Sequence, residues 1–473
     1  MFSFIRVALS LSLLLTVQCA PTLLENQVGT DVETHQVNFA ASPSSSNRDE
    51  QPTTVPAGSG PFLLRTAASD TSQNFLSTAV PEQPLVMAYY PDWAGPSYPP
   101  ENIDFSRFDW IDFAFALPTE AHDIAWDTGE APDLLRRLVA AGHAAGTKIK
   151  LSVGGWTGSK YFSQAVATPD NRYQFASNIL SVYRNFSLDG IDLDWEYPGR
   201  QGAEGNEIDP QDSNNFLLFL HCLRSVLPIG ARITAAAQTV PFTDSSGQPT
   251  KDVSQFAGVL DWLLLMNYDL WGSSSTPGPN APLNDGCQNS TQPEGNAVAA
   301  FNKWTYAGFP ASQLVLGLPA YGYISKSNAR GLRQRRDTHF NETRTKRPRN
   351  RDPASRSIFK VHSEEGGTDG EITFRELVEQ GALVLTRPAD SDRPAFFDAA
   401  KGFERQWDSC SSTPYLRSPS GRQIVTYDDP DSLHMKAEFA RRVGMLGVNM
   451  FDTHGDTEQW HMINAARMAL GRS

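Results

Sequence analysis

Short apolar runs alternate with longer helical stretches along the chain from about residue 85 onward. Apolar runs of this length, bounded by polar and turn residues, are typical of buried strands, and the stretches between them have helical periodicity. The expected strands cover Leu85–Tyr90, Trp110–Leu117, Lys148–Val153, Gly190–Trp195, Ile233–Gln238, Trp262–Tyr268, Val315–Pro319 and Gly447–Phe451. The expected helices include Asp133–Ala145, Pro169–Asn185, Asn214–Leu227, Asn296–Ala307 and Ser432–Val443.

Eight strands that alternate with helices predict parallel pairing through crossovers, and a closed (β/α)8 TIM barrel is the natural arrangement for that number. An open doubly wound sheet is the alternative, but no glycine-rich phosphate loop follows the first expected strand. The distance between the seventh and eighth strands is too long for one helix, so we expect an insertion over about 324–422. The barrel with its insertion is expected to occupy 81–473.

The expected insertion holds a helix-like stretch, Thr373–Gln380, and a run of basic residues. The run is interpreted as a solvated loop; the alternative is proteolytic processing at Arg335-Arg336 or Lys346-Arg347. The basic residues of the run are Arg330, Arg333, Arg335, Arg336, Arg344, Lys346, Arg347, Arg349 and Arg351.

The N-terminus indicates export. Arg6 precedes an apolar stretch that is too short to span a bilayer, and small residues follow it, so residues 1–19 are expected to be a signal peptide. Residues 20–80 are rich in Ser, Thr and Pro without apolar periodicity, and we expect a disordered arm. No later stretch is long and apolar enough for a membrane span. In a secreted, extracellular chain, Asn185, Asn289 and Asn341 begin glycosylation sequons.

The net charge of the chain limits the classes of partner that it is expected to bind. The chain has 53 acidic and 40 basic residues, a formal net charge of -13, which argues against nucleic acid as a partner. It suits a soluble protein that acts on a neutral or slightly cationic substrate. Nothing in the sequence indicates oligomerisation, and a monomer is expected.

Export also affects how the four cysteines are interpreted. Cys19 is expected to leave with the signal peptide. Cys222 lies in an apolar run and is expected to be a buried free thiol. Cys287 and Cys410 have polar, loop-like surroundings, so we expect them to form a disulfide.

The most informative segment is residues 189–196, Asp-Gly-Ile-Asp-Leu-Asp-Trp-Glu. Side chains alternate along a strand, so Asp192, Asp194 and Glu196 share one side, with Glu196 at the C-terminal end, where barrel enzymes build their active sites. Stacked like charges in a barrel interior destabilise the fold, and coupling between them raises the proton affinity of one carboxyl, as a general acid requires. A magnesium or calcium site is the alternative chemistry, but no coordinating pattern accompanies the three acids.

This segment resembles the Asp-x-x-Asp-x-Asp-x-Glu signature of glycoside hydrolase family 18, the retaining chitinases and their relatives. Four further motifs are similar to those of the family and occur in the same order; the chain is most like the secreted fungal type. They are Ser152-Val153-Gly154-Gly155, Met266-Asn267-Tyr268-Asp269, Leu318-Pro319-Ala320-Tyr321-Gly322 and Tyr427-Asp428-Asp429.

The resemblance implies a substrate-assisted mechanism without cofactor or metal. Glu196 is expected to protonate the glycosidic oxygen and later to activate water, while the 2-acetamido oxygen of the substrate attacks the anomeric carbon. Asp194 is expected to orient the acetamido nitrogen and Asp192 to share its proton. Tyr268 is expected to bind the acetamido oxygen, and Asp269 to position the sugar. The implied substrate is chitin or a chito-oligosaccharide.

Residues near the strand ends are expected to bind substrate, with core packing as the alternative for each aromatic ring. Where the family usually has Trp at the end of strand eight, this chain has Phe451, and we expect weaker binding at that subsite. The expected substrate-binding residues are Tyr90, Phe115, Gly155, Trp156, Tyr197, Met266, Trp271, Tyr321 and Phe451; Trp93 also lies at a strand end.

Two other functions remain open: an endo-β-N-acetylglucosaminidase that acts on N-glycans, and a non-catalytic chitin-binding lectin. The insertion favours a walled cleft for a linear chain, and the presence of Glu196, Asp194 and Tyr268 favours an enzyme over a lectin.

Overall fold

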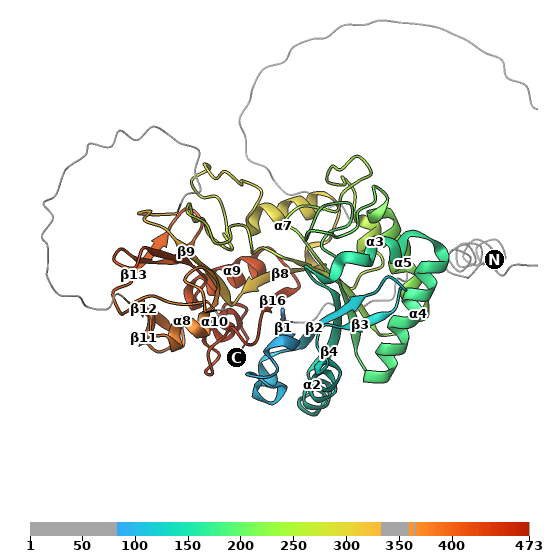
Figure 1. The fold of residues 1–473 in the computed structure, drawn as a ribbon, viewed down its shortest axis with the longest axis horizontal. Helices are drawn as coiled ribbons and strands as arrows, with labels where there is room; N and C mark the ends of the chain where they lie inside the picture. Colours follow the sequence, from blue (N-terminus) through green and yellow to red (C-terminus); the bar gives the residue numbers. More distant parts are fainter. Residues whose placement is uncertain (1–82, 333–358, 364–365, 473) are drawn as a thin grey trace, which may run out of the picture. The chain divides into compact units, whose positions relative to one another are not determined.

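The computed structural model describes residues 83–332, 359–363 and 366–472 (Figure 1). Several expectations concern residues outside these ranges. They are the signal peptide over 1–19, the arm over 20–80, the sequon at Asn341, the pairs Arg335-Arg336 and Lys346-Arg347, and most of the basic run.

The expected barrel is confirmed. Eight parallel strands form a ring in the order β1-β2-β4-β5-β6-β7-β8-β16, and pairing of β1 with both β2 and β16 closes it. The strands are β1 (Leu85–Pro91), β2 (Trp110–Pro118), β4 (Lys148–Gly154), β5 (Gly190–Asp194), β6 (Arg232–Ala237), β7 (Trp262–Leu265), β8 (Leu314–Pro319) and β16 (Gly447–Phe451).

The five expected helices are also present, and local capping explains where several of them begin. Thr168 accepts a hydrogen bond from the Asn171 N–H at the start of α4, and Asn296 does the same for Ala299 at the start of α7. Asp429 and Ser432 form a reciprocal capping box on α9, which gives the Tyr-Asp-Asp motif a structural role. The helices are α2 (Ala131–Ala145), α4 (Pro169–Phe186), α5 (Asp212–Val226), α7 (Ala297–Tyr306) and α9 (Pro430–Arg442).

Shorter elements complete the barrel and were not expected from the sequence. They are β3 (Ile124–Trp126), α3 (Phe162–Ala167), α6 (Ser254–Ala257), α10 (His461–Ala469) and the 3-10 helices η1 (Asp92–Ala94), η2 (Pro100–Asn102), η3 (Phe105–Arg107), η4 (Gly158–Tyr161) and η5 (Ala311–Gln313).

The insertion after β8 is a small α+β unit that runs from β9 to β15. Its elements β9, β11, β12, β13 and α8 are labelled in Figure 1. Its larger sheet is antiparallel, in the order β10-β9-β15-β14-β13, and β11 pairs with β12. The expected helix is α8 (Phe374–Glu379), which Thr373 and Glu376 cap reciprocally. The strands are β9 (Tyr321–Lys326), β10 (Gly370–Thr373), β11 (Leu383–Arg387), β12 (Phe396–Ala399), β13 (Glu404–Asp408), β14 (Thr413–Ser418) and β15 (Gln423–Thr426).

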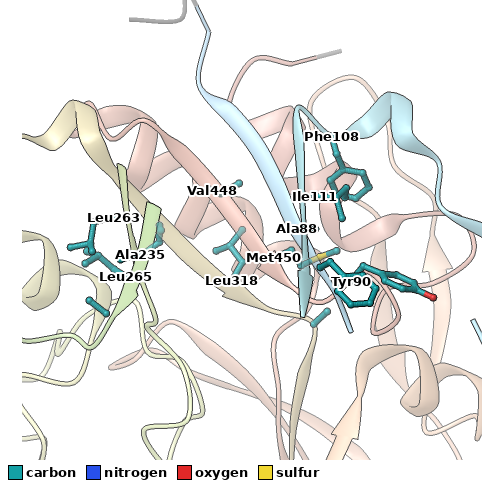
Figure 2. Close-up of a cluster of buried hydrophobic side chains, with 14 of the residues drawn as sticks. Ala88, Tyr90, Phe108, Ile111, Ala235, Leu263, Leu265, Leu318, Val448 and Met450 are labelled. Carbon is teal, nitrogen blue, oxygen red and sulfur yellow. The ribbon is translucent and has the colours of Figure 1, made fainter. Parts of the chain in front are cut away.

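Alternation along the barrel strands separates two apolar layers. The outer layer lies between strands and helices and includes Ala88, Ile111, Leu263 and Met450, as Figure 2 shows. The inner layer fills the barrel interior with Met87, Tyr89, Ala114, Ala236, Trp262, Leu264, Val315 and Leu446. The inner positions of the strands therefore bring their side chains to one shared space.

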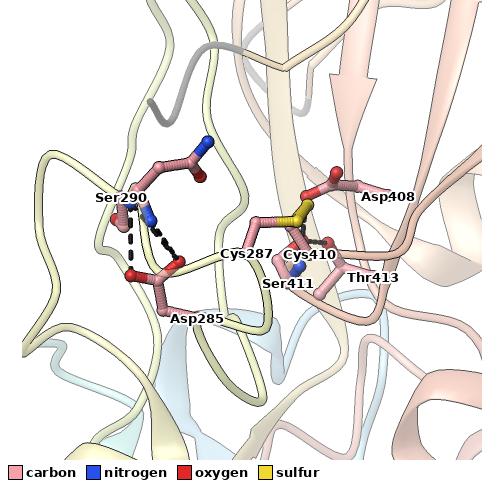
Figure 3. Close-up of a disulfide and its surroundings, with 8 residues drawn as sticks. Asp285, Cys287, Ser290, Asp408, Cys410, Ser411 and Thr413 are labelled. Carbon is pink, nitrogen blue, oxygen red and sulfur yellow. Dashed lines mark hydrogen bonds between the residues drawn. A yellow bond between two sulfur atoms is a disulfide. The ribbon is translucent and has the colours of Figure 1, made fainter. Parts of the chain in front are cut away.

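A disulfide joins Cys287 and Cys410, with their Cα atoms 5.1 Å apart (Figure 3). It links the loop that follows β7 to the turn between β13 and β14. The Gly286 N–H also donates to the Cys410 carbonyl (2.8 Å), and the Leu283 N–H donates to the Ser411 carbonyl (2.9 Å). The expected pairing of these two cysteines is therefore present in the structure.

The expectation of a free thiol at Cys222 is wrong. Cys222 is disulfide-bonded and 3% exposed. Apolar surroundings accommodate a disulfide sulfur as readily as a thiol, so burial in an apolar helix face does not distinguish the two states.

We expect the double variant Cys287→Ser/Cys410→Ser to lower the free energy of unfolding by about 2–5 kcal/mol, because the bond closes a long loop. Urea denaturation of the variant and the wild type measures the difference. Equal midpoints and slopes would show that the backbone hydrogen bonds alone hold this junction.

Within the part of the chain that the structure describes, no helix is long and apolar enough to cross a membrane.

Candidate functional site

Three acids follow one another along the inner side of β5 and just beyond its end. Asp192 and Asp194 are buried, at 1% and 4% exposure, and Glu196 is the second residue after the strand. Ile191, Leu193 and Trp195 point to the outer layer, as alternation predicts. The expected stack of acids inside the barrel is thus present.

Two glycines at the end of β4 allow the backbone to approach this strand. Gly154 has φ +119° and Gly155 has φ +82°, conformations that L side chains rarely adopt. A Cβ on Gly154 would lie 2.1 Å from the Asp194 carbonyl oxygen, and one on Gly155 would lie 2.9 Å from the Phe115 ring. The Gly155 N–H donates to the Asp194 carbonyl (2.8 Å). The Ser-x-Gly-Gly motif therefore sets the backbone beside the acids.

Asp192 accepts hydrogen bonds from three hydroxyl groups on neighbouring strands. Tyr89 and Ser152 donate to its Oδ2 (2.9 and 2.8 Å), and Thr234 donates to its Oδ1 (2.6 Å). These three hydrogen bonds hold the buried carboxyl group in one position between β1, β4 and β6. The proton shared by Asp192 and Asp194 stays a prediction.

Asp194 has the opposite environment. Burial raises its pKa well above the usual value, and the nearby charges of Glu196, Asp192 and Asp112 raise it further. Its Oδ1 atom is buried and accepts no hydrogen bond within the described structure. A buried acceptor without a partner is costly, so this atom is suited to bind a donor on a ligand.

Glu196 is adapted to hold a proton near neutrality. Burial raises its pKa from 4.5 to about 7, a hydrogen bond with Tyr197 lowers it, and the charge of Asp269 raises it. The Glu196 N–H donates to Ser159 Oγ (2.8 Å), and Asn206 donates to the Glu196 carbonyl (3.1 Å). The backbone of the acid is thereby held on both sides.

This raised pKa makes Glu196→Gln a stabilising substitution above acidic pH. The folded state keeps the proton up to about pH 7, whereas the unfolded chain releases it near 4.5, so the penalty on folding grows between these values and is constant above them. We expect the variant to gain about 1–3 kcal/mol of stability at pH 8 and almost none at pH 4.5. Urea denaturation at both pH values measures it, with Glu204→Gln as the exposed control; an equal gain at both would contradict the raised pKa.

Tyr268 and Asp269 follow β7 and face the same end of the barrel. Asp269 has φ +59°, and its N–H donates to Asn280 Oδ1 (2.8 Å). Tyr321 and Tyr323 both donate to Asp269 Oδ1, each at 2.7 Å. Burial and the charges of Asp194, Asp269 and Glu196 raise the pKa of Tyr268 well above its usual value, so its hydroxyl remains a donor.

Aromatic rings gather around Phe451 at the end of β16. Its ring centroid lies 5.4 Å from that of Tyr89, 6.5 Å from Trp93, 6.2 Å from Tyr268 and 6.1 Å from Tyr321. Phe115 joins this group through Tyr89 and Trp93, with centroids 6.3 and 6.1 Å away. Apolar ring faces of this kind stack on the apolar faces of sugars.

Tyr90 is not part of the site, so its expected contact with substrate is wrong. It is fully buried in the outer layer, and its hydroxyl donates to the Tyr98 carbonyl (2.9 Å) (Figure 2). The preceding residue, Tyr89, faces the interior instead, because neighbouring residues of a strand face opposite sides.

The other expected binding residues lie around the acids or on the loops. Met266 packs against the interior cluster and against Tyr268 and Tyr321. Trp156 follows β4 and is 53% exposed. Trp271 is half-buried and covers Gly278 of its own loop. Substrate binding by Trp156 and Trp271 stays a prediction.

The first Asp of the acid motif has a structural role. Asp189 precedes β5, and its carboxylate contacts His143 (2.8 Å), Lys148 (3.1 Å) and the Ile149 N–H (2.9 Å). It therefore ties the start of β5 to β4 and α2, at the opposite end of the strand from Glu196.

Sequence reasoning missed several residues of this network: Tyr89, Asp112, Lys150, Thr234, Asn280, Tyr323 and Asn449. Most of them are polar or amphipathic residues at alternate positions of otherwise apolar strands. That alternation was the available signal, because a side chain facing the interior differs by one residue from one facing the helices.

Of the expected glycosylation sites within the described ranges, Asn185 is exposed on the last turn of α4, and Asn289 is half-buried near the disulfide. Modification of both stays a prediction. Among the described residues, no group of three or more His, Cys, Asp or Glu side chains is arranged to hold a metal ion.

Comparison with known proteins places the chain in a family. The family described as "Glycosyl hydrolases family 18" matches residues 85–456, and the chain belongs to this family. A chitinase-like effector of Moniliophthora roreri is 35% identical over 82% of this chain and 93% of its own length. A second, from Moniliophthora perniciosa, is 32% identical over 82% and 87%. The crystal structure of a chitinase from Rhizomucor miehei has 29% identity and a TM-score of 0.65 over 81% of this chain and 99% of its own.

Proposed function

We propose that this glycoside hydrolase is a secreted chitinase that cuts β-1,4 bonds of N-acetylglucosamine polymers with retention of configuration. The observation that carries the proposal is Glu196, a carboxyl group with a pKa of about 7 at the C-terminal end of β5, beside the buried Asp194. An acid with this pKa delivers a proton at neutral pH and then accepts one from water.

The remaining residues of the site each bind a different part of the sugar. Asp194 Oδ1, buried without a partner, accepts the acetamido N–H and stabilises the positive charge that develops on the acetamido group. Tyr268 donates to the acetamido oxygen and holds it under the anomeric carbon. That oxygen attacks as Glu196 protonates the leaving oxygen, and water assisted by Glu196 then opens the cyclic intermediate. Phe451 and its neighbouring rings support the sugar face.

A second candidate function is chitin binding without cleavage. Two similar relatives carry the description chitinase-like effector, and Phe451 provides a smaller platform than Trp. The intact set of Glu196, Asp194, Tyr268 and Asp269 favours catalysis over this alternative. Cleavage of N-glycans with the same residues is a third candidate.

Hydrolysis of soluble N-acetylglucosamine oligomers, of chitin and of an N-glycoprotein, compared in parallel, tests the proposal. We expect soluble products from the oligomers and from chitin. Binding of oligomers without products from any substrate would support the non-catalytic function, and release from the glycoprotein alone would support the N-glycan enzyme.

We expect Phe451→Trp to lower KM for the oligomers by about 3- to 10-fold, because indole adds apolar contact worth about 1 kcal/mol. Phe451→Ala should raise KM by a similar factor, and kcat should change less in both variants. Steady-state kinetics measures the split. Unchanged KM in both variants would remove the ring from the binding surface.

Export is part of the same proposal, supported by the charged and apolar segments before residue 20. Expression in a eukaryotic host tests it: the protein is expected in the medium, with an N-terminus that no longer begins at Met1. Retention inside the cells with Met1 still present would contradict export.

A further inference from the structure

A lysine is buried inside the barrel on the N-terminal side of the catalytic acids. Lys150 lies on β4, two residues before Ser152, and is 1% exposed. Its ammonium group lies over two neighbouring indole rings, 4.5 Å from the ring centroid of Trp262 and 5.9 Å from that of Trp110. A charged group is buried only where it is paired and hydrogen-bonded, so the partners of this ammonium define its role.

The ammonium connects two carboxyl groups on different strands. Nζ forms an ion pair with Asp112 Oδ1 on β2 (3.0 Å) and donates to Thr234 Oγ1 on β6 (2.8 Å). Because the Thr234 oxygen accepts from Lys150, its hydroxyl hydrogen is directed to Asp192 Oδ1, 2.6 Å away. An ordered chain of donors therefore runs from Lys150 through Thr234 to Asp192, and each bond polarises the next.

Several acids surround this ammonium, and their negative charges affect one another. Burial raises the pKa of Asp112 to about 6, the charge of Lys150 lowers it and the charge of Asp192 raises it. The charge of Asp112 in turn adds to the effect of burial on the pKa of Asp194. Asn449 on β16 donates to Asp112 (2.9 Å), and Tyr89 on β1 donates to Asp192. The titratable groups that face Lys150 and its partners are thus Asp112, Asp192, Asp194 and Tyr89. The ammonium opposes the repulsion among the acids.

We propose that Lys150 is a positioning residue for the catalytic acids: through Thr234 it fixes the direction of a hydrogen bond to Asp192, and with Asp112 it sets the balance of charge that the acids of β5 face. Lys150 touches no reacting atom. The inference rests on the proposed function for its kinetic test, but the charge arrangement exists whether or not the site hydrolyses chitin.

Two variants that change the buried charge in opposite directions test the proposal. The measured quantity is the acidic limb of the pH profile, that is, the pH below which kcat/KM on N-acetylglucosamine oligomers falls. That limb reports the coupled carboxyl groups of the site, among them Asp194, whose pKa is raised by burial and then by the charges of Glu196, Asp192 and Asp112. Lys150→Met should move it up by about one pH unit, and Asp112→Asn should move it down by a similar amount. The double variant should return close to the wild type. Opposite shifts are not produced by loss of packing.

A buried ion pair elsewhere provides the matched control. Lys436 and Asp428 are fully buried and paired beside α9, outside the barrel interior. Lys436→Met should lower the melting temperature and leave the limb unmoved. Shifts of the same sign in Lys150→Met and Asp112→Asn, or none in either, would overturn the proposal. If Lys150→Met does not fold, Asp112→Asn decides alone, by a downward shift or its absence.

The same variants separate this inference from the proposed function. If the wild type hydrolyses none of the substrates, the proposed function fails, and the pH dependence of oligomer binding, followed by tryptophan fluorescence, replaces the kinetic limb. Opposite shifts in binding would then support the role of Lys150, and unshifted binding would reject it.

Discussion

Glu196→Gln is expected to lose about 10³- to 10⁵-fold in kcat on N-acetylglucosamine oligomers. The amide has nearly the shape of the carboxyl group but delivers no proton to the leaving oxygen and accepts none from water. Oligomer binding should change little, because the surrounding Asp194, Tyr268 and Phe451 remain in place. Initial rates and equilibrium binding measure the two effects separately.

Glu204→Gln is the matched control for this substitution. Glu204 is exposed on the loop that follows β5, so the variant should keep the wild-type rate. A Glu196→Gln protein that is folded and keeps more than about a tenth of wild-type kcat would remove Glu196 from the role of acid.

The second large effect is expected for Asp194→Ala, with a loss of about 10²- to 10⁴-fold in kcat/KM. The substitution removes the acceptor that orients the acetamido nitrogen and the charge that stabilises the intermediate. It also removes a buried carboxyl group whose pKa is raised by burial, so stability should stay equal or increase at neutral pH. Kinetics and thermal unfolding together distinguish this result from general damage to the fold.

Asp189→Asn provides the control from the same motif. Its ion pairs with His143 and Lys148 lie at the other end of β5, so the variant should lose some stability and keep its kcat. An Asp194→Ala protein with wild-type kcat/KM would contradict the substrate-assisted scheme.

The barrel was predictable because buried parallel strands appear as nearly continuous apolar runs. All eight strands begin within one residue of the expected positions. The largest difference is at β7, expected to reach Tyr268 but ending at Leu265. The chain leaves the strand there because Asp269 adopts a positive φ and Asn280 holds its N–H, a contact made by a distant part of the loop.

The position of each side chain was harder to predict than the strands. Glu196, Asp194 and Asp192 were placed on the correct side of the strand because three acids at alternate positions share one side, and the apolar residues between them mark the other. Tyr90 was placed wrongly because both tyrosines of β1 look equivalent in sequence, and a shift of one residue exchanges the two faces.

Side-chain contacts between different strands could not be predicted from the sequence. The pairing of Asp112 with Lys150 depends on the register between β2 and β4, in which these two residues lie opposite each other. The short strands of the insertion lack the continuous apolar pattern of the barrel, and β11 is largely exposed.

The anomeric form of the first product tests the central claim most directly. Proton NMR of N-acetylglucosamine oligomer cleavage, recorded before mutarotation, should show the β-anomer at the new reducing end, because two successive displacements at the anomeric carbon retain its configuration. Initial formation of the α-anomer would show direct attack by water and would contradict the participation of the acetamido group that Asp194 and Tyr268 are arranged to assist.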